Sequence, residues 1–246
     1  TFTGVSGATA LALALNNNVL AGSITLASNQ TINLTQAQYN DGTTLAKLQS
    51  KITNLNASGE ILAVSGFSSI DAANTFLNAN TNVGQALLAP SASSTLSYTQ
   101  YVADKAQLAN IKTSTGGDLS ITVSGGLTAA NAVAVNGVLN NSFVSSVTIS
   151  DVGSAIANNL DALQAQVGKI SAITLSNKSV PLDLKQSQLA ADSDVLSLIN
   201  NYSARVTLDQ GAKDIDVALS LLANNSKVAS VILGAGVSTT ASLSYT

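Results

Sequence analysis

The feature that most constrains this sequence is a repeat with a period of about 59 residues. The tripeptide Val-Ser-Gly occurs at Val5, Val64 and Val123, and a related Asp-x-Gly occurs at Asp151 and Asp209, 58 residues apart. Fixed periods of this kind are typical of stacked structural units. We therefore predict one continuous repeat array, with repeats over 5–63 and 64–122, a half repeat over 123–150, a full repeat over 151–208 and a truncated repeat over 209–246.

The repeat over 151–208 indicates what each unit contains. Its apolar residues recur at helical spacing, which places them along one side of a helix: Ile156, Leu160, Leu163, Val167 and Ile170. Short runs with Thr between apolar residues follow, Ile-Thr-Leu at 173–175 and Val-Thr-Leu at 206–208, and this alternation is typical of a strand. Strands that alternate with helices favour a parallel sheet. The predicted fold is α/β, a solenoid of helix–strand units with a mainly parallel sheet, in which each unit buries its apolar stripe against the next.

Residues with special backbone or capping properties lie near the predicted element ends. Glycines follow the predicted strands, where the chain turns into a helix: Gly7, Gly66, Gly125, Gly153 and Gly211. Asp151 and Asp209 lie near helix starts, where a carboxylate accepts hydrogen bonds from free N–H groups. Asn clusters predict helix ends in the left-handed conformation, at Asn16 to Asn18, Asn140–Asn141, Asn200–Asn201 and Asn224–Asn225.

Composition argues against several classes of function. Only 9% of residues are charged, and the ten Lys and Arg form no basic cluster, so a nucleic-acid partner is not expected. The chain has no Cys and no His, which excludes a disulfide framework, a thiolate or His-ligated metal site and a Ser-His-Asp triad within it. No apolar run is long enough to predict a membrane span. The first residues include neither an initiator Met nor a signal segment, which we interpret as a piece of a longer polypeptide.

The remaining catalytic and phosphate-binding patterns are weak. A Ser–Lys pair at Ser187 and Lys185 is better interpreted as solvated helix surface, and Gly234-Ala235-Gly236 as a plain connector. A lyase or hydrolase would need several convergent charged residues, whereas the thirteen carboxylates are scattered along the chain. We therefore expect a protein without enzymatic activity and without a cofactor.

Two acidic clusters raise calcium binding as an alternative. The denser one contains Asp192 and Asp194 with Asp183 nearby, and the second contains Asp214 and Asp216. Calcium takes six or more oxygen ligands, including several carboxylates. Residues two apart on a helix point to different sides, so the favoured interpretation is charge in the first turn of a helix.

Threonines and tyrosines are the candidate binding residues. Thr lies at the middle of five predicted strands: Thr25, Thr122, Thr148, Thr174 and Thr207. Stacked strands would place them in one row that could bind ice or a glycan. The favoured alternative is that β-branched Thr suits a half-exposed sheet, and Leu87 and Ile232 interrupt the row. The tyrosines are expected to pack between repeats, with sugar stacking as the alternative: Tyr39, Tyr98, Tyr101, Tyr202 and Tyr245.

Three segments carry a family resemblance: AIANNLDALQ at 155–164, KISAITLS at 169–176 and LDLKQSQLAADSDVLSLI at 182–199. Together they resemble the repeats of large type I-secreted adhesins and haemolysin-type extracellular proteins of Gram-negative bacteria. The resemblance implies an extracellular or cell-surface location and a structural role. The calcium-binding GGxGxDx nonapeptide is missing, so calcium binding is not carried over.

These observations predict a non-catalytic repeat segment of a bacterial cell-surface or extracellular protein. It would form part of a stalk, a matrix filament or a surface layer, and its partners would be copies of itself or adjacent repeats of the same longer chain. The alternative is an adhesin module that recognises a glycan or ice through a Thr-lined sheet face.

Overall fold

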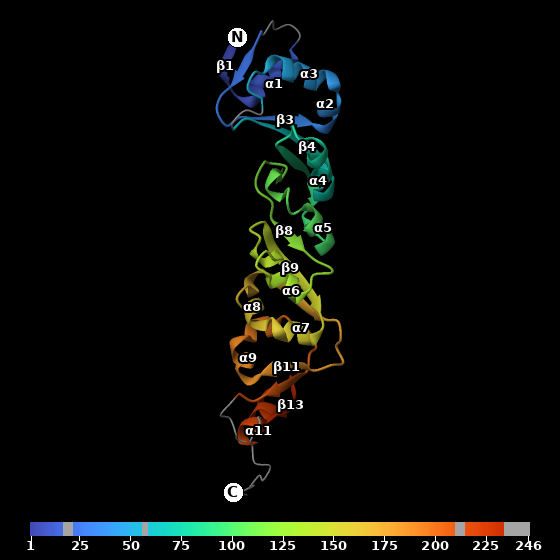
Figure 1. The fold of residues 1–246 in the computed structure, drawn as a ribbon, viewed down its shortest axis with the longest axis vertical. Helices are drawn as coiled ribbons and strands as arrows, with labels where there is room; N and C mark the ends of the chain where they lie inside the picture. The colour runs from blue at the N-terminus through green and yellow to red at the C-terminus, as the bar shows by residue number, and fades with distance from the viewer. Residues whose placement is uncertain (17–21, 56–58, 210–214, 234–246) are drawn as a thin grey trace. The chain divides into compact units, whose positions relative to one another are not determined.

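The computed structural model describes residues 1–16, 22–55, 59–209 and 215–233 (Figure 1). They belong to two compact units. The first unit contains residues 1–95 and 99–120, and the second contains residues 96–98 and those described from 121 onward. Both units combine helices with parallel sheets, so the predicted α/β class with mainly parallel pairing is confirmed.

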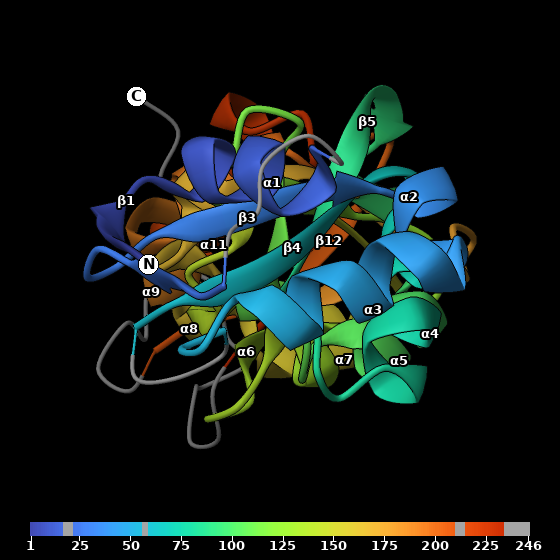
Figure 2. The same ribbon diagram turned by 90° about the horizontal axis from the view of Figure 1, so that it is seen from above.

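Two parallel sheets form the first unit. One consists of β1 (Phe2–Val5) and β2 (Ile24–Leu26). The other has the order β3 (Thr31–Thr35), β4 (Ile61–Ser69), β5 (Gln85–Ser93) and β7 (Ile111–Lys112). The helices are α1 (Gly7–Leu15), α2 (Gln36–Asn40), α3 (Gly42–Lys51), α4 (Ile70–Ala79) and α5 (Tyr98–Asp104), followed by the 3₁₀ turn η1 (Leu108–Asn110). Helix α1 packs beside β3 (Figure 2). It also contacts α3, and α4 packs on β4 and β5.

The second unit also contains two mainly parallel sheets. The first has the order β6 (Thr95–Leu96), β8 (Ile121–Val123), β9 (Val144–Asp151) and β10 (Ile170–Leu175). The second has the order β11 (Leu182–Lys185), β12 (Ala204–Thr207) and β13 (Val228–Ile232). The helical segments are α6 (Ala129–Val133), η2 (Val138–Asn140), α7 (Gly153–Asn158), α8 (Leu160–Gln164), η3 (Val167–Lys169), α9 (Gln186–Ala191), α10 (Ser193–Ser197) and α11 (Ile215–Asn224).

Strands that pair are close in the sequence and are joined by helical crossovers. Paired residues are 21 to 30 positions apart in every parallel pair that the structure describes. The Val-Ser-Gly copies all begin in strands, but Val5 lies in the β1–β2 sheet and Val64 in the neighbouring sheet of the same unit. The equal sequence spacing therefore does not bring these two valines into one sheet.

Three residues of the predicted apolar stripe lie in the core of the second unit, although its helix is interrupted. The prediction was wrong for the other two, since Val167 is only half-buried in η3 and Ile170 lies in strand β10. Ile156, Leu160 and Leu163 are fully buried. Helix α7 ends one residue before Asn159, whose side-chain amide donates to the Ala155 carbonyl at 2.8 Å. A side chain that hydrogen-bonds the backbone in this way competes with helix continuation, and α8 begins directly afterwards. One long helix was expected here, and the structure has two short ones.

The Asn clusters end helices mostly without the left-handed conformation. Asn16 is the C-cap residue of α1 with φ −73°, and Asn141 ends η2 with φ −81°. Within the described residues of these clusters, Asn201 alone has positive φ, at 55°. The prediction of left-handed caps was therefore wrong at the other described positions. Asn17, Asn18, Gly211 and Gly234 to Gly236 lie outside the described residues.

Buried tyrosines fill gaps between helices and strands. Tyr39 is 9% exposed, packs edge-on against Phe76 with ring centroids 5.1 Å apart, and donates its hydroxyl to Asn80 and Asn82 at 3.0 Å. Tyr101 is also buried, while Tyr202 lies under the Lys227 ammonium. A satisfied hydroxyl on a buried ring is the expected arrangement for a packing residue. Tyr245 lies outside the described residues.

Candidate functional site

The five threonines that the sequence singles out lie in three sheets. Thr25 is in β2 and Thr207 in β12, whereas Thr122, Thr148 and Thr174 are in β8, β9 and β10. Their neighbours along each strand are buried, so the predicted alternation is confirmed. The five threonines do not form a single row, because the strands that carry them do not share a sheet.

Within β8, β9 and β10 the threonines are also out of register. Their cross-strand partners are Ser or Ala: Thr122 pairs with Ser146, Thr148 with Ala172, and Thr174 with Ser150. The outer face of this sheet therefore carries a mixture of hydroxyl and methyl groups. This register does not produce the regular ladder of Thr side chains that ice binding would need.

The three aspartates of the denser acidic cluster are separated by their own partners. Asp183 forms a two-pronged ion pair with Arg205, with distances of 2.6 Å and 2.7 Å to the guanidinium. Asp194 accepts a hydrogen bond from Gln164 at 3.1 Å. Asp192 is buried and 2% exposed. Within the described residues no three His, Cys, Asp or Glu side chains come together as metal ligands, and Asp214 of the second cluster lies outside them.

A polar groove of about 450 Å³ lies beside Asp183 in the second unit. Its lining contains Asp183 and Thr207 from the predicted set, together with Lys185 and Gln188. Gln188 donates to Asp161 at 3.2 Å across the groove. The lining residues are Ala157, Asn158, Asn159, Asp161, Ala162, Asp183, Leu184, Lys185, Gln188 and Thr207.

Asp161 of this groove forms a carboxyl pair with the buried Asp192. Asp192 lies between α9 and α10, and its Oδ2 has no hydrogen-bond donor among the described residues. Burial raises the pKa of Asp192 to about 6, with further contributions from its hydrogen bond to the Asp161 carboxyl and from that group's negative charge. Two carboxyl groups can hydrogen-bond only when one of them carries a proton. The pair is therefore a proton-binding arrangement.

The first unit contains a related arrangement with an amide in place of one carboxyl. Asp104 is fully buried at the end of α5 and accepts a hydrogen bond of 2.7 Å from the Asn74 amide. Burial and the charge of Asp71 raise the pKa of Asp104, while the Asn74 hydrogen bond lowers it. This carboxylate has a donor at Oδ1 without needing a proton.

Helix starts are capped by side chains from the following strand region. The Asp151 carboxylate accepts from the Ala129 N–H at 3.0 Å, and the Asp209 carboxylate accepts from the Ser187 N–H at 2.9 Å. Capping by these two aspartates is confirmed, but each one caps the helix that precedes it in the sequence. Amide side chains do the same elsewhere: Gln30 accepts from Gly7 at 3.2 Å and Asn177 accepts from Gly153 at 2.8 Å.

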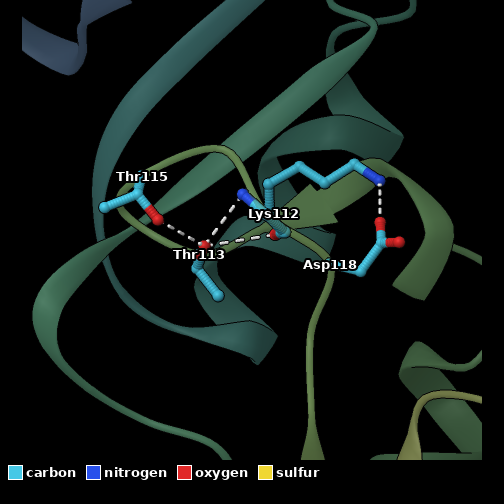
Figure 3. A network of polar contacts seen from close by, with 5 residues as sticks. Lys112, Thr113, Thr115 and Asp118 are labelled. Carbon is cyan, nitrogen blue, oxygen red and sulfur yellow. Dashed lines mark hydrogen bonds and ion pairs between the residues drawn. The ribbon is translucent and has the colours of Figure 1, made fainter.

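A further polar cluster in the first unit is a closed turn (Figure 3). Lys112 and Asp118 form an ion pair at 2.7 Å, with 75% of the Asp118 side chain exposed. Inside the turn, the Thr113 hydroxyl accepts from the Gly117 N–H at 3.0 Å and lies 3.2 Å from the Thr115 hydroxyl. Each of these side chains has a partner within the turn, so the cluster stabilises the loop.

The sequence analysis named Asp192 only as a calcium candidate, and it missed Asp104 and the partners of both carboxyl groups on the preceding helices. Asp161 and Asp192 are 31 residues apart, and Asn74 and Asp104 are 30 apart. Both spacings are close to half of the 59-residue repeat, and this was the signal that could have found them. A search for polar residues at half-repeat spacing within apolar helical segments would have found both pairs.

Comparison with protein-family models, with curated proteins and with solved structures finds no match for this chain. Within the described residues, the helices are too short or too polar for any of them to cross a lipid bilayer.

Proposed function

We propose that this chain is a non-catalytic structural repeat segment of a bacterial extracellular or cell-surface protein, and that it self-associates. The observation that carries the proposal is the order of the strands. The parallel pairings join strands that neighbour each other in the order of a sheet, and they make neighbours of residues 21 to 30 positions apart in the sequence. Such nearest-neighbour stacking supports a solenoid, the finer architecture that we propose for both units.

Contacts between successive segments support the same proposal. A side chain that follows one strand caps the preceding helix, as at Asp151 and Asp209. Hydroxyls on one strand also donate to the carbonyls of the strand before, from Ser145 to Ile121 and from Ser171 to Val147. Most of these polar groups therefore hold one segment to the next, as expected for a stalk, filament or layer.

The proposal of a non-enzyme is supported by the chemistry of the groove. Asp183 is neutralised by Arg205. Asp192, whose pKa is raised to about 6, is almost fully buried and is not among the residues that line the groove. The off-register threonines give no support to the alternative of an ice-binding or glycan-binding ladder, which we do not propose.

A candidate surface for self-association lies on α11. Ile215, Leu219 and Leu222 recur at helical spacing on this helix and are 37%, 50% and 42% exposed. An apolar stripe of this kind is typically buried in an assembly. We propose that a second copy of this chain covers this stripe, because an assembly of identical segments brings the surfaces of neighbouring copies into contact.

The test is sedimentation and electron microscopy over a concentration series, with a double variant, Leu219→Asn with Leu222→Asn. We expect the unaltered chain to form oligomers or fibres at high concentration and the double variant to shift to monomer by at least about tenfold in concentration. Val135→Asn is the matched control, because Val135 is 90% exposed in the same unit but lies off α11. A chain that stays monomeric throughout, or a control that acts like the double variant, would contradict the proposal.

A further inference from the structure

The carboxyl pair of Asp161 and Asp192 has no role in the proposed assembly. The first unit contains a similar contact between two helices, but there an Asn takes the place of one of the two Asp residues. In both units a buried Asp lies at the end of a short helix and faces a polar residue on the preceding helix: Asp104 faces Asn74, and Asp192 faces Asp161. Both buried carboxyls also have an Oδ2 without a donor among the described residues.

The hydrogen bonds around Asp104 and Asp192 are also similar. Three residues after Asp104, Gln107 donates to the Asn78 side chain at 3.0 Å. Three residues after Asp192, the Val195 N–H donates to the Gln164 side chain at 2.9 Å. Asn78 and Gln164 each lie one turn beyond Asn74 or Asp161 on the same helical segment. Each unit therefore contains a similar helix–helix contact, in which the partner of the buried Asp is Asn74 in the first unit and Asp161 in the second.

That exchange changes what the contact requires. An Asn amide donates to a carboxylate at any pH, whereas two carboxylates repel each other and lack a hydrogen atom between them. A buried carboxylate without a donor is strongly destabilising, so the pair needs a proton to form its hydrogen bond.

We propose that Asp161 and Asp192 form a proton-binding site that fastens α8 to the junction of α9 and α10 when it is protonated and loosens this contact when it is deprotonated. The site makes the packing of the second unit pH-sensitive. This inference does not depend on self-association.

Among the charged groups on the neighbouring elements, Asp161 is the one that influences the protonation of Asp192. Helices α7 and α9 carry no charged residue. On α10, Asp194 is held by Gln164, and on β11, Asp183 is paired with Arg205. Lys185 lines the groove beside Asp183, and Asp209 is engaged at the start of α9 through Ser187.

The sign of the effect follows from the raised pKa of Asp192. Because the proton is held more tightly in the folded state, the stabilisation is fully present below the ordinary pKa of 3.8 and is lost as the pH rises through about 6. A gap of about two pH units corresponds to a roughly hundredfold change in the equilibrium for opening this contact. The chain has no His, so no ordinary side chain titrates near pH 6 and masks the transition.

The experiment is an NMR titration of the Asp carboxyl carbons, together with amide hydrogen exchange in 186–197 corrected for the intrinsic pH dependence of exchange. We expect one carboxyl to titrate near pH 6, as the raised pKa of Asp192 predicts, and exchange in α9 and α10 to become faster above that pH. Asp161→Asn should lower this pKa by at least about one unit and flatten the exchange profile, because the new amide donates to the Asp192 carboxylate.

Two further variants keep the test decisive. Asp194→Asn removes one carboxylate close to Asp192 but leaves the pair intact, and it should leave the transition in place. Asn74→Asp places the same carboxyl pair in the first unit and should raise the pKa of Asp104 further, because the donated hydrogen bond of Asn74 is lost and a second carboxyl takes its place. If Asp161→Asn does not fold, Asp192→Asn replaces it, with the amide donating to Asp161. A transition that survives removal of either partner, or that Asp194→Asn abolishes, overturns the proposal.

Discussion

Individual polar side chains in this protein hold neighbouring segments together. The chain has few charges, and several of them lie at helix ends: Asp151 and Asp209 cap helix starts, and Lys51 and Lys169 donate to the last carbonyls of earlier helical segments at 3.1 Å and 2.9 Å. Both arrangements complement the helix dipole as well as satisfying free backbone groups. Since each side chain comes from a later segment, the cap also fixes the position of that segment.

Removing one of these caps should destabilise the unit that contains it. Asp151→Ala leaves the Ala129 N–H without its acceptor, and we expect a loss of about 1 kcal/mol in the free energy of unfolding. Urea unfolding monitored by circular dichroism measures it. Asp118→Ala is the control, because its ion pair is largely exposed and should contribute less than about 0.5 kcal/mol. Equal effects of the two substitutions would show that the cap has no special role.

At the scale of elements, short helices are joined to strands by tight contacts. Two Gln residues near the starts of α2 and α9 have a defined role: Gln38 and Gln188 accept hydrogen bonds from the backbone N–H groups of Thr35 and Lys185 at 2.9 Å and 3.0 Å. Gly7 opens α1 against β3, and a Cβ at this position would lie 1.9 Å from the Thr31 carbonyl oxygen. Only glycine lets the helix approach the strand backbone this closely.

The close approach at Gly7 gives a prediction with an internal control. Gly7→Ala should reduce the free energy of unfolding by about 2 kcal/mol or more, because backbone must move to admit the methyl group. Gly42→Ala, at the start of α3, meets no atom within 4 Å and should be neutral or stabilising by up to about 1 kcal/mol. Thermal and urea unfolding of both variants would check this, and similar effects at the two sites would contradict the steric argument.

At the scale of the whole molecule, each unit is built from parallel strands with helical crossovers, and its core is apolar. The buried polar exceptions include Asp104 and Asp192, and both lie at contacts between helices. No set of described residues provides the several converging oxygens that a calcium ion takes. Stability should therefore come from packing and capping within each unit.

Calcium should leave the stability of the chain unchanged. We expect the same urea midpoint in millimolar calcium and in excess chelator, because Asp183, Asp192 and Asp194 are held apart by Arg205, Asp161 and Gln164. Magnesium at the same concentration controls for ionic strength. A midpoint that rises with calcium alone would show that these carboxylates rearrange to bind the ion.

The sequence by itself determined the class of the fold and most of the elements. Alternation around residues such as Thr122 and Thr174 identified strands, and the spacing of Ile156, Leu160 and Leu163 identified a buried helical stripe. These patterns are local, because an apolar face follows from the period of a helix or strand. The break at Asn159 was missed, since its cause is a single side-chain hydrogen bond to the helix backbone.

Only the tertiary structure decided the register of the sheets and the partners of the polar groups. The equal spacing of Val5 and Val64 spans two sheets, and Thr148 meets Ala172 instead of another Thr. Such pairings depend on how far each crossover carries the chain, which differs from segment to segment. For the same reason Asp192 became a proton-binding group only when packing buried it beside Asp161, because solvent exposure and neighbouring charge set the state of a carboxyl group.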